Sequence, residues 1–143
     1  MQEITTRVLA RDQLLHGWGQ AAAQLQALGW REGLLRFGSG WAASFGGPAP
    51  DPFRVSLSEL SGALLAQESA GRGEVGSDDV ELVLGEGAVC LRLCNDAHIH
   101  LRVASSGVLA DTFFTLWQAA GWRPVEYRFE QQGRKAIRAR SAG

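Results

Sequence analysis

The stretch VELVLGEGAVCLRLCNDAHIHLRV, residues 80–103, decides the fold. In three runs every second residue is apolar, and the short segments GEG and NDA separate the runs. A period of two is that of a β-strand with one buried face, and short turns join antiparallel neighbours. The sequence therefore predicts a three-stranded antiparallel meander with these inward residues: Val80, Leu82, Leu84, Val89, Leu91, Leu93, Ile99, Leu101 and Val103.

Two longer segments on either side of the meander have helical spacing. Apolar residues from Leu14 to Leu28 recur at steps of three and four after a possible N-cap at Asp12, and Gly29 stops the run. Residues 108–120 repeat this pattern and stop at Gly121. A shorter helix follows Ser58. Because Gly17 and Gly19 each cost about 1 kcal/mol inside a helix, we expect another part of the protein to pack closely there.

The remaining segments predict further strands over residues 4–9, 34–37, 41–45, 53–57 and 125–129. Residues 25–37 and 117–129 match at seven of thirteen positions, and each reads as helix end, glycine, tryptophan, then strand. Duplication and convergence both explain this match, and both predict two equivalent returns from a helix to one sheet. The expected fold is α+β: a mostly antiparallel sheet of five to seven strands with two or three helices packed on one face.

The size and charge of the chain favour one ordinary globular domain. It has 143 residues and a formal net charge of −1, so a dedicated polyanion binder is not expected. We expect one domain over residues 1–130 and a flexible basic tail over 131–143 with a net charge of +4. No apolar run is long enough to span a bilayer, and the first residues lack the features of a signal peptide. These features predict a cytoplasmic protein.

The side chains between the inward residues of the meander are the first candidates for chemistry. If Leu93 pairs with Ile99, Cys94 lies opposite His98, and both face away from the core with His100. Cys94, His98 and His100 would then supply two or three ligands to Zn²⁺. A half-exposed or covered polar face explains the same residues without a metal. We keep the zinc site as an alternative and expect no cofactor.

The sequence contains no complete catalytic constellation. Cys94 with His98 as its base would need a third group to orient the imidazole, and none can be named from the sequence. The glycines of residues 38–40 precede neither a helix start nor a lysine, so a phosphate loop is not expected. The basic tail lacks interleaved aromatics, and nucleic acid is therefore an unlikely partner. We expect no enzymatic activity.

Two groups of residues favour binding to another protein. Residues 68–86 contain six acids and one arginine, and we expect this acidic segment to contact a basic partner through Asp78, Asp79 and Glu81. Aromatic residues also gather around the proline-rich loop that follows residue 45. They are Trp41, Phe45 and Phe53. A solvated acidic loop and aromatics that fill the core are the simpler alternatives. The predicted function is that of a non-enzymatic module of the bacterial accessory kind, immunity-like or chaperone-like, that masks another polypeptide.

Overall fold

The computed structural model describes residues 1–41, 48–105, 107–129 and 136–142. Within these ranges the elements are, in order, β1 (Gln2–Thr5), α1 (Arg11–Ala27), β2 (Glu32–Phe37), β3 (Phe53–Ser56), η2 (Leu57–Glu59), α2 (Leu60–Ser69), β4 (Val80–Leu84), η3 (Gly85–Gly87), β5 (Val89–Leu93), β6 (Ile99–Val103), α3 (Val108–Ala119), β7 (Val125–Phe129) and β8 (Ala136–Ser141). The eight strands form one antiparallel sheet in the order β3-β2-β4-β5-β6-β1-β7-β8. The predicted α+β class is confirmed, with one strand more than the expected maximum.

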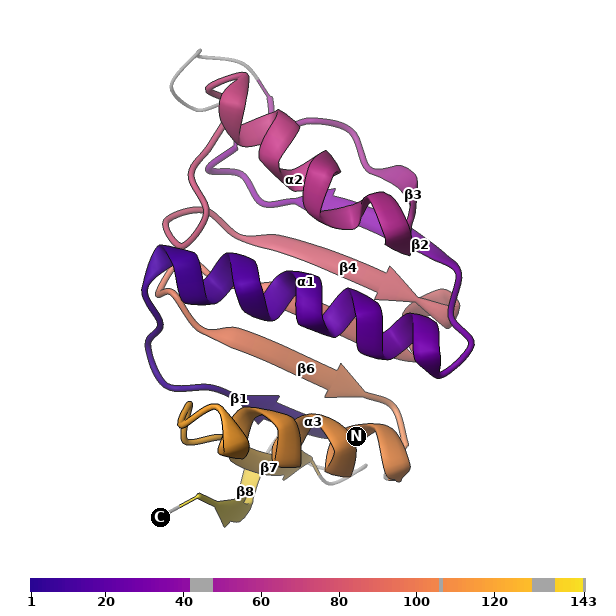
Figure 1. Ribbon diagram of the computed structural model, residues 1–143, viewed down its shortest axis with the longest axis vertical. Coiled ribbons are helices and arrows are strands. Elements are labelled where there is room, and N and C mark those ends of the chain that lie inside the picture. The colour runs from indigo at the N-terminus through magenta and orange to yellow at the C-terminus, as the bar shows by residue number, and fades with distance from the viewer. Residues whose placement is uncertain (42–47, 106, 130–135, 143) are drawn as a thin grey trace.

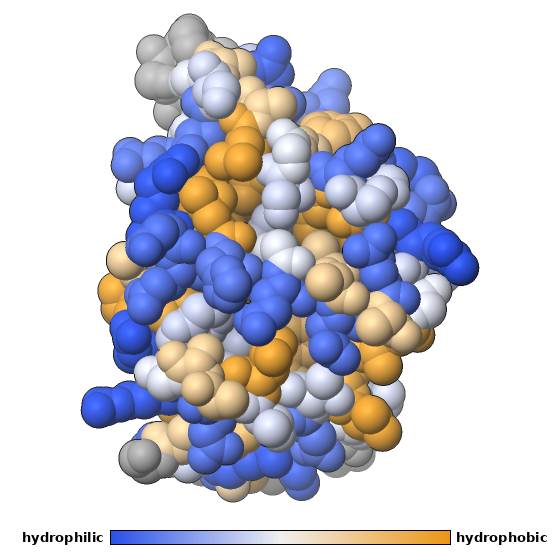
Figure 2. Space-filling view, in the orientation of Figure 1, coloured by the Kyte–Doolittle hydropathy of each residue, from blue (hydrophilic) through white to orange (hydrophobic). Residues whose placement is uncertain are grey.

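All three α-helices lie on the same face of the sheet (Figure 1). The core fills the space between them, and the nine inward residues predicted for the meander are all buried. Leu93 pairs with Ile99 and Leu82 with Leu91, so the predicted meander and its register are confirmed. On the outside of the helix layer, hydrophilic side chains cross α1, and hydrophobic ones show mainly in patches between the helices (Figure 2). None of the described helices is long and apolar enough to cross a membrane.

The first strand of the chain lies inside the sheet, between β6 and β7. It pairs with both neighbours over all four of its residues, and Ile4 is fully buried. Helix α1 then carries the chain across the sheet to β2, near the opposite edge (Figure 1). Because β1 lies between β6 and β7, its outward side chains, Glu3 and Thr5, lie beside residues that are about 100 positions away in the sequence.

The two similar segments end their helices in the same way. The amide of Trp30 donates to the carbonyl of Leu25 at 3.0 Å, and the amide of Trp122 donates to that of Trp117 at 2.9 Å. The glycines in between, Gly29 and Gly121, have φ of 99° and 76°. This left-handed geometry closes the last turn and satisfies the terminal carbonyls. Each segment then enters a strand one place from a sheet edge, so the two predicted equivalent returns are confirmed.

Three sequence-based expectations about segments need correction. Residues 41–45 were expected to form a hairpin strand, but Trp41 lies outside any strand and residues 42–45 lie outside the described ranges. Strand β2 pairs instead with β3 and β4. The first strand was expected over residues 4–9 and ends at Thr5. Residues 136–141, expected in a flexible tail, form β8 because the free edge of β7 offers backbone partners.

Candidate functional site on the open face of the sheet

The face of the sheet away from the helices carries a row of polar side chains. Backbone register places Arg36, Glu81, Arg92, His100 and Thr5 side by side on five neighbouring strands, from β2 to β1. Because successive residues of a strand point to opposite faces, all five side chains leave the core and point outward. We call these five residues the polar row. They bring together groups that are separated by up to 95 positions in the chain.

At one end of the polar row, Glu81 is held by two partners. The Nε of Arg36 donates to its Oε1 at 2.9 Å, and the thiol of Cys90 donates to its Oε2 at 3.1 Å. Burial raises the pKa of Glu81, but the hydrogen bonds from Arg36 and Cys90 outweigh it and lower the pKa. Burial and the bond to Glu81 raise the pKa of Cys90 to about 12. Cys90 is therefore held as a protonated thiol.

At the other end, Glu3 and Thr5 fix the His100 imidazole. Glu3 Oε1 and Thr5 Oγ1 each lie 3.0 Å from His100 Nδ1. The Nη2 of Arg102 also donates to Glu3 Oε2 at 2.9 Å. The hydrogen bond with His100 is the largest cause that lowers the pKa of Glu3 to about 2, and Arg102 adds to it against the effect of burial. Glu3 is therefore an anion at any pH where the imidazole titrates.

Cys94 follows β5 on the same face as His100. Its sulfur accepts the amide of His98 at 3.4 Å, and His100 stands two residues further along the facing strand. Burial raises the pKa of Cys94, but the influence of His100 and of nearby backbone amides outweighs it, so the pKa lies below its ordinary value. Burial likewise lowers the pKa of His100, yet the influence of Cys94 and Glu3 raises it overall.

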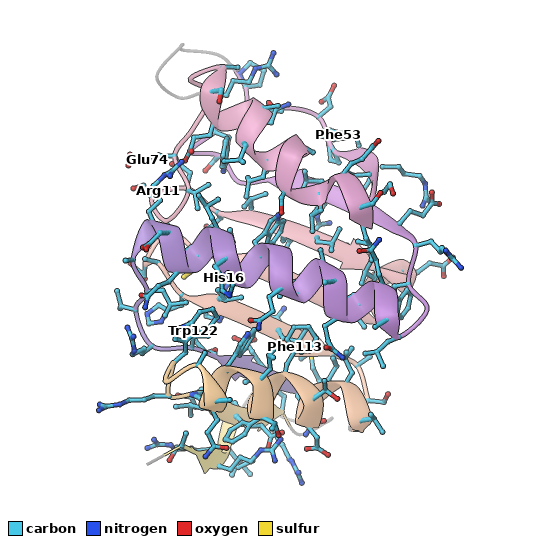
Figure 3. All side chains as sticks on the ribbon, viewed as in Figure 1. Arg11, His16, Phe53, Glu74, Phe113 and Trp122 are labelled. Carbon is cyan, nitrogen blue, oxygen red and sulfur yellow. The ribbon has the colours of Figure 1, made fainter. Side chains whose placement is uncertain are left out.

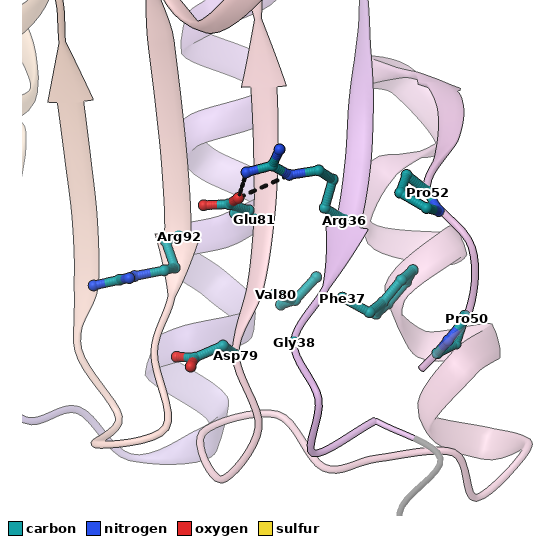
Figure 4. Close-up of a pocket in the computed structure, with 9 residues that line it drawn as sticks. All are labelled: Arg36, Phe37, Gly38, Pro50, Pro52, Asp79, Val80, Glu81 and Arg92. Atoms are coloured by element: carbon teal, nitrogen blue, oxygen red, sulfur yellow. Dashed lines mark hydrogen bonds and ion pairs between the residues drawn. The ribbon is translucent and has the colours of Figure 1, made fainter. Parts of the chain in front are cut away.

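Between these two groups, Arg92 has no ion pair or hydrogen bond to any described residue. Its guanidinium points away from Glu81, toward β6 (Figure 4). Its side chain lines one end of a pocket of about 380 Å³ that crosses β5, β4 and β2. Phe37, Pro50 and Pro52 form an apolar wall at the other end. The pocket thus runs from an apolar surface to the side chain of Arg92, whose guanidinium extends past the pocket toward β6 and has no ion pair or hydrogen bond within the described ranges.

The predicted aromatic contact group does not form as such. Trp41 is fully buried and packs edge-on against Phe37 with ring centroids 5.0 Å apart, so the prediction that it faces a partner is wrong. Phe53 is half-buried and packs against the core, and its ring centroid lies 6.0 Å from that of Phe37. Phe45 lies outside the described residues. Trp41 and Phe53 therefore pack with Phe37 against the core.

The acids predicted to meet a basic partner are bound within the chain. Asp78 Oδ2 accepts the amide of Glu74 at 2.9 Å, and Asp79 Oδ1 accepts the amide of Asn95 at 2.9 Å. Glu81 pairs with Arg36 as described above. The three carboxylates therefore hold a loop, a turn and the polar row in place, but only the charge of Glu81 is balanced by an ion pair.

The alternative zinc site is not formed. His98 Nδ1 lies 2.7 Å from the carbonyl oxygen of Thr6, while His100 Nδ1 faces Glu3 and Thr5. Within the described ranges, no three His, Cys, Asp or Glu side chains are grouped so that they could hold a metal ion. The prediction of Cys94, His98 and His100 as ligands fails because the two imidazoles bond to different neighbours.

Sequence reasoning missed the roles of Glu3 and Arg92. The base considered for Cys94 and set aside was His98, and its ring lies against the carbonyl oxygen of Thr6. The orienting carboxylate comes from β1, which no local pattern ties to β6. Comparison of the chain with protein-family models, with curated proteins and with solved structures finds no match. The site must therefore be interpreted from its own geometry.

Proposed function

We propose that this protein is a non-enzymatic, cytoplasmic binding module that masks another polypeptide, in the manner of an immunity or chaperone protein, and that the pocket at Arg92 receives the partner. The observation that carries this proposal is the guanidinium of Arg92, which has no ion pair among the described residues although it lies in a row of paired charges. Two free thiols fit the reducing conditions of that compartment.

The pocket suggests the chemistry of the partner segment. A carboxylate would complement Arg92, and an apolar side chain would fit the wall of Phe37, Pro50 and Pro52. The wall and Arg92 lie on strands two places apart, so the two groups are separated by roughly 10–15 Å, which is three to four residues of extended chain. The preferred segment therefore has an apolar residue followed or preceded at that spacing by Asp or Glu. Because Glu81 is already paired with Arg36, we place an acidic residue of the partner, and not a basic one, at this pocket.

A random peptide library displayed on phage tests this proposal directly. Selection on the wild-type protein should enrich peptides with an apolar and an acidic residue at this spacing. Arg92→Glu should reverse the selected charge, so that Lys or Arg replaces the acid. Arg31→Glu is the matched control, because Arg31 is exposed and its side chain has no ion pair within the described ranges. No enrichment, or the same acidic peptides on Arg92→Glu, would refute the pocket as the binding site.

A second measurement addresses the partner itself. The protein is immobilised and used to isolate its partner from cells of the source organism. Wild type and Arg31→Glu should retain the same polypeptide, and Arg92→Glu should lose it. The retained complex should also weaken as ionic strength rises, because an exposed charge pair is screened by salt. Equal retention by all three proteins would show that the partner binds elsewhere.

A further inference from the structure

The two edge strands of the sheet differ in how they are protected against pairing with another chain. Strand β3 has four residues and directly follows Pro52, and its one charged residue, Arg54, is paired with Glu32 at 3.3 Å. Strand β8 has six residues, with no proline and no acid among them. It ends the sheet beside the C-terminus, and among the described strands only β7 pairs with it (Figure 1). Because a short strand and a proline are what proteins use to block an edge, β8 is the less protected of the two.

The exposed side chains of β8 indicate which kind of strand would fit beside it. Backbone register pairs Arg138 with Tyr127, and Tyr127 with Glu3, so Arg138 points to the open face of the sheet. Its neighbour Ile137 points to the face that carries the helices and is 48% exposed. Arg138 is exposed and has no ion pair or hydrogen bond to any residue that the structure describes. An acid on a neighbouring strand would complement Arg138, and an apolar residue next to that acid would cover Ile137.

We propose that β8 binds an acidic, extended segment of another polypeptide, which adds one more strand to the sheet. The free side of the β8 backbone would supply main-chain hydrogen bonds, while Arg138 and Ile137 would select the side chains of the incoming strand. The proposal does not depend on the pocket at Arg92. Strands β6, β1 and β7 separate β5 from β8, which places the two sites roughly 20 Å apart.

Charge argues against a second copy of this chain as the occupant of the edge. Strand β8 carries Arg138 and Arg140 and no acid, so two β8 strands placed side by side would bring arginines of both copies together. Like charges on neighbouring strands destabilise their pairing, and charged side chains on an edge strand prevent self-association. An acidic strand turns this repulsion into attraction. The edge is therefore complementary to a partner of opposite charge.

Strand β8 is held in place by contacts that do not use its outer edge. It pairs with β7 over five residue pairs, and beyond the strand the amide of Ala142 donates to the carbonyl of Pro124 at 3.0 Å. Arg140 also reaches Glu126 on β7 and Asp111 on α3. Because these contacts involve β7, α3 and the segment between them, an added strand would displace none of them. Arg138 is the arginine of β8 that remains for the incoming strand.

The experiment measures how three short fluorescein-labelled peptides bind, by fluorescence anisotropy. Valine alternates with glutamate in the first, lysine replaces glutamate in the second, and proline replaces a central valine of the acidic sequence in the third. The first should bind at least about tenfold more tightly than the other two, because lysine is repelled by Arg138 and proline removes a backbone donor. No binding of the first peptide at about 1 mM, or equal binding of the third, would overturn the proposal.

Charge-reversal variants separate this site from the pocket, because both sites favour acids. Arg92→Glu removes the attraction of the pocket and should still bind the acidic peptide. Adding Arg138→Glu should abolish that binding and favour the lysine peptide instead. Adding Arg31→Glu, the same change of charge at an exposed residue before β2, should leave the preference for the acidic peptide unchanged. Loss of the acidic peptide from Arg92→Glu alone, or equal effects of the two added substitutions, would overturn the proposal.

Hydrogen exchange in the wild type tests the site without any substitution. A saturating amount of the acidic peptide should slow the exchange of backbone amides in β8, residues 136–141, because the added strand restricts opening of that edge. The amides of β3, residues 53–56, are the internal control and should exchange at an unchanged rate. Unchanged or faster exchange in β8, or slower exchange in β3, would overturn the proposal.

Discussion

The guanidinium Nε of Arg140 lies 3.3 Å from Oε2 of Glu126, a carboxylate that is only 1% exposed. Gln2 donates to the other oxygen of this carboxylate at 2.7 Å, and Arg140 Nη2 reaches Asp111 on α3 at 2.7 Å. The same guanidinium lies 4.0 Å above the ring of Phe114. A single side chain of β8 thus joins the last strand to β7 and to α3.

Removal of this side chain should therefore destabilise the whole domain. Arg140→Ala leaves the buried Glu126 with only the exposed Arg128, 3.9 Å away, as a cation, and we expect a loss of about 3 kcal/mol in the free energy of unfolding. Arg138→Ala, an exposed residue on the same strand, is the control and should change it by less than about 0.5 kcal/mol. Urea denaturation monitored by circular dichroism measures both. Equal small losses would mean that β8 contributes little to stability.

The two glycines inside α1 should respond to substitution in opposite directions. A β-carbon at Gly17 would lie 2.5 Å from Ile99 and 2.9 Å from the ring of Trp122, which lies between α1 and α3 (Figure 3). Gly17→Ala should cost roughly 1–3 kcal/mol despite the better helix propensity of alanine. At Gly19 the nearest heavy atom is Ser61 Oγ at 3.4 Å, so Gly19→Ala should be neutral or stabilise by up to about 1 kcal/mol. Thermal and urea denaturation of the two variants measure these changes. A similar effect at both positions would mean that close packing at Gly17 does not determine the outcome.

Trp41 should behave as a core residue and not as a contact for a partner. It is fully buried, and a β-carbon at Gly73 would approach its ring to 2.4 Å, so the ring packs directly against the backbone of Gly73. Trp41→Ala should reduce the free energy of unfolding by about 3–5 kcal/mol. Chemical denaturation provides the measurement. A loss below about 1 kcal/mol together with normal folding would return Trp41 to the list of surface contacts.

Glu3 should contribute to stability with a defined dependence on pH. Its folded pKa of about 2 lies below the ordinary value of 4.5, mainly because His100 hydrogen-bonds to it. The contribution is therefore complete above about pH 4.5 and is lost as the pH falls toward 2, and it amounts to at most about 3 kcal/mol. In a plot of unfolding free energy against pH, the Glu3→Gln variant should therefore lose less stability than the wild type between pH 4.5 and 2.

The control for this pH profile is Asp51→Asn, which removes an exposed carboxylate from the loop before β3. Its profile should run parallel to that of the wild type. If the profiles of Glu3→Gln and the wild type were parallel between pH 2 and 4.5, the bond between Glu3 and His100 would not stabilise the folded state.

Local patterns in the sequence predict local structure well in this chain. Alternation fixed the faces and register of the meander, because a shift by one residue would expose its apolar side chains. Spacing and glycine stops placed α1 and α3 to within a few residues. The interior position of β1 could not be predicted, because it depends on pairing with residues about 100 positions away. Strand β8 was missed because its alternating arginines resemble a solvated tail.

On the open face of the sheet, the sequence predicted only the neighbours that belong to the single hairpin of β5 and β6. Alternation correctly placed Cys90, Arg92 and His100 on one face, but not their partners. Glu81 and Arg36 come from strands whose order in the sheet no short motif encodes, and Glu3 enters through β1. The charge of residues 68–86 suggested a free acidic surface because the sequence does not show which carboxylates accept backbone amides or pair with distant arginines.

The interior position of β1 also bears on how the chain folds during synthesis. Residues 2–5 are made well before both strands that flank them, because β6 and β7 come from residues 99–129. A ribosome therefore releases more than ninety further residues before β1 has any neighbour, and the strands on its two sides remain unjoined until then. Such long separations between paired residues slow folding, and unpaired strand edges invite association with other chains in the meantime.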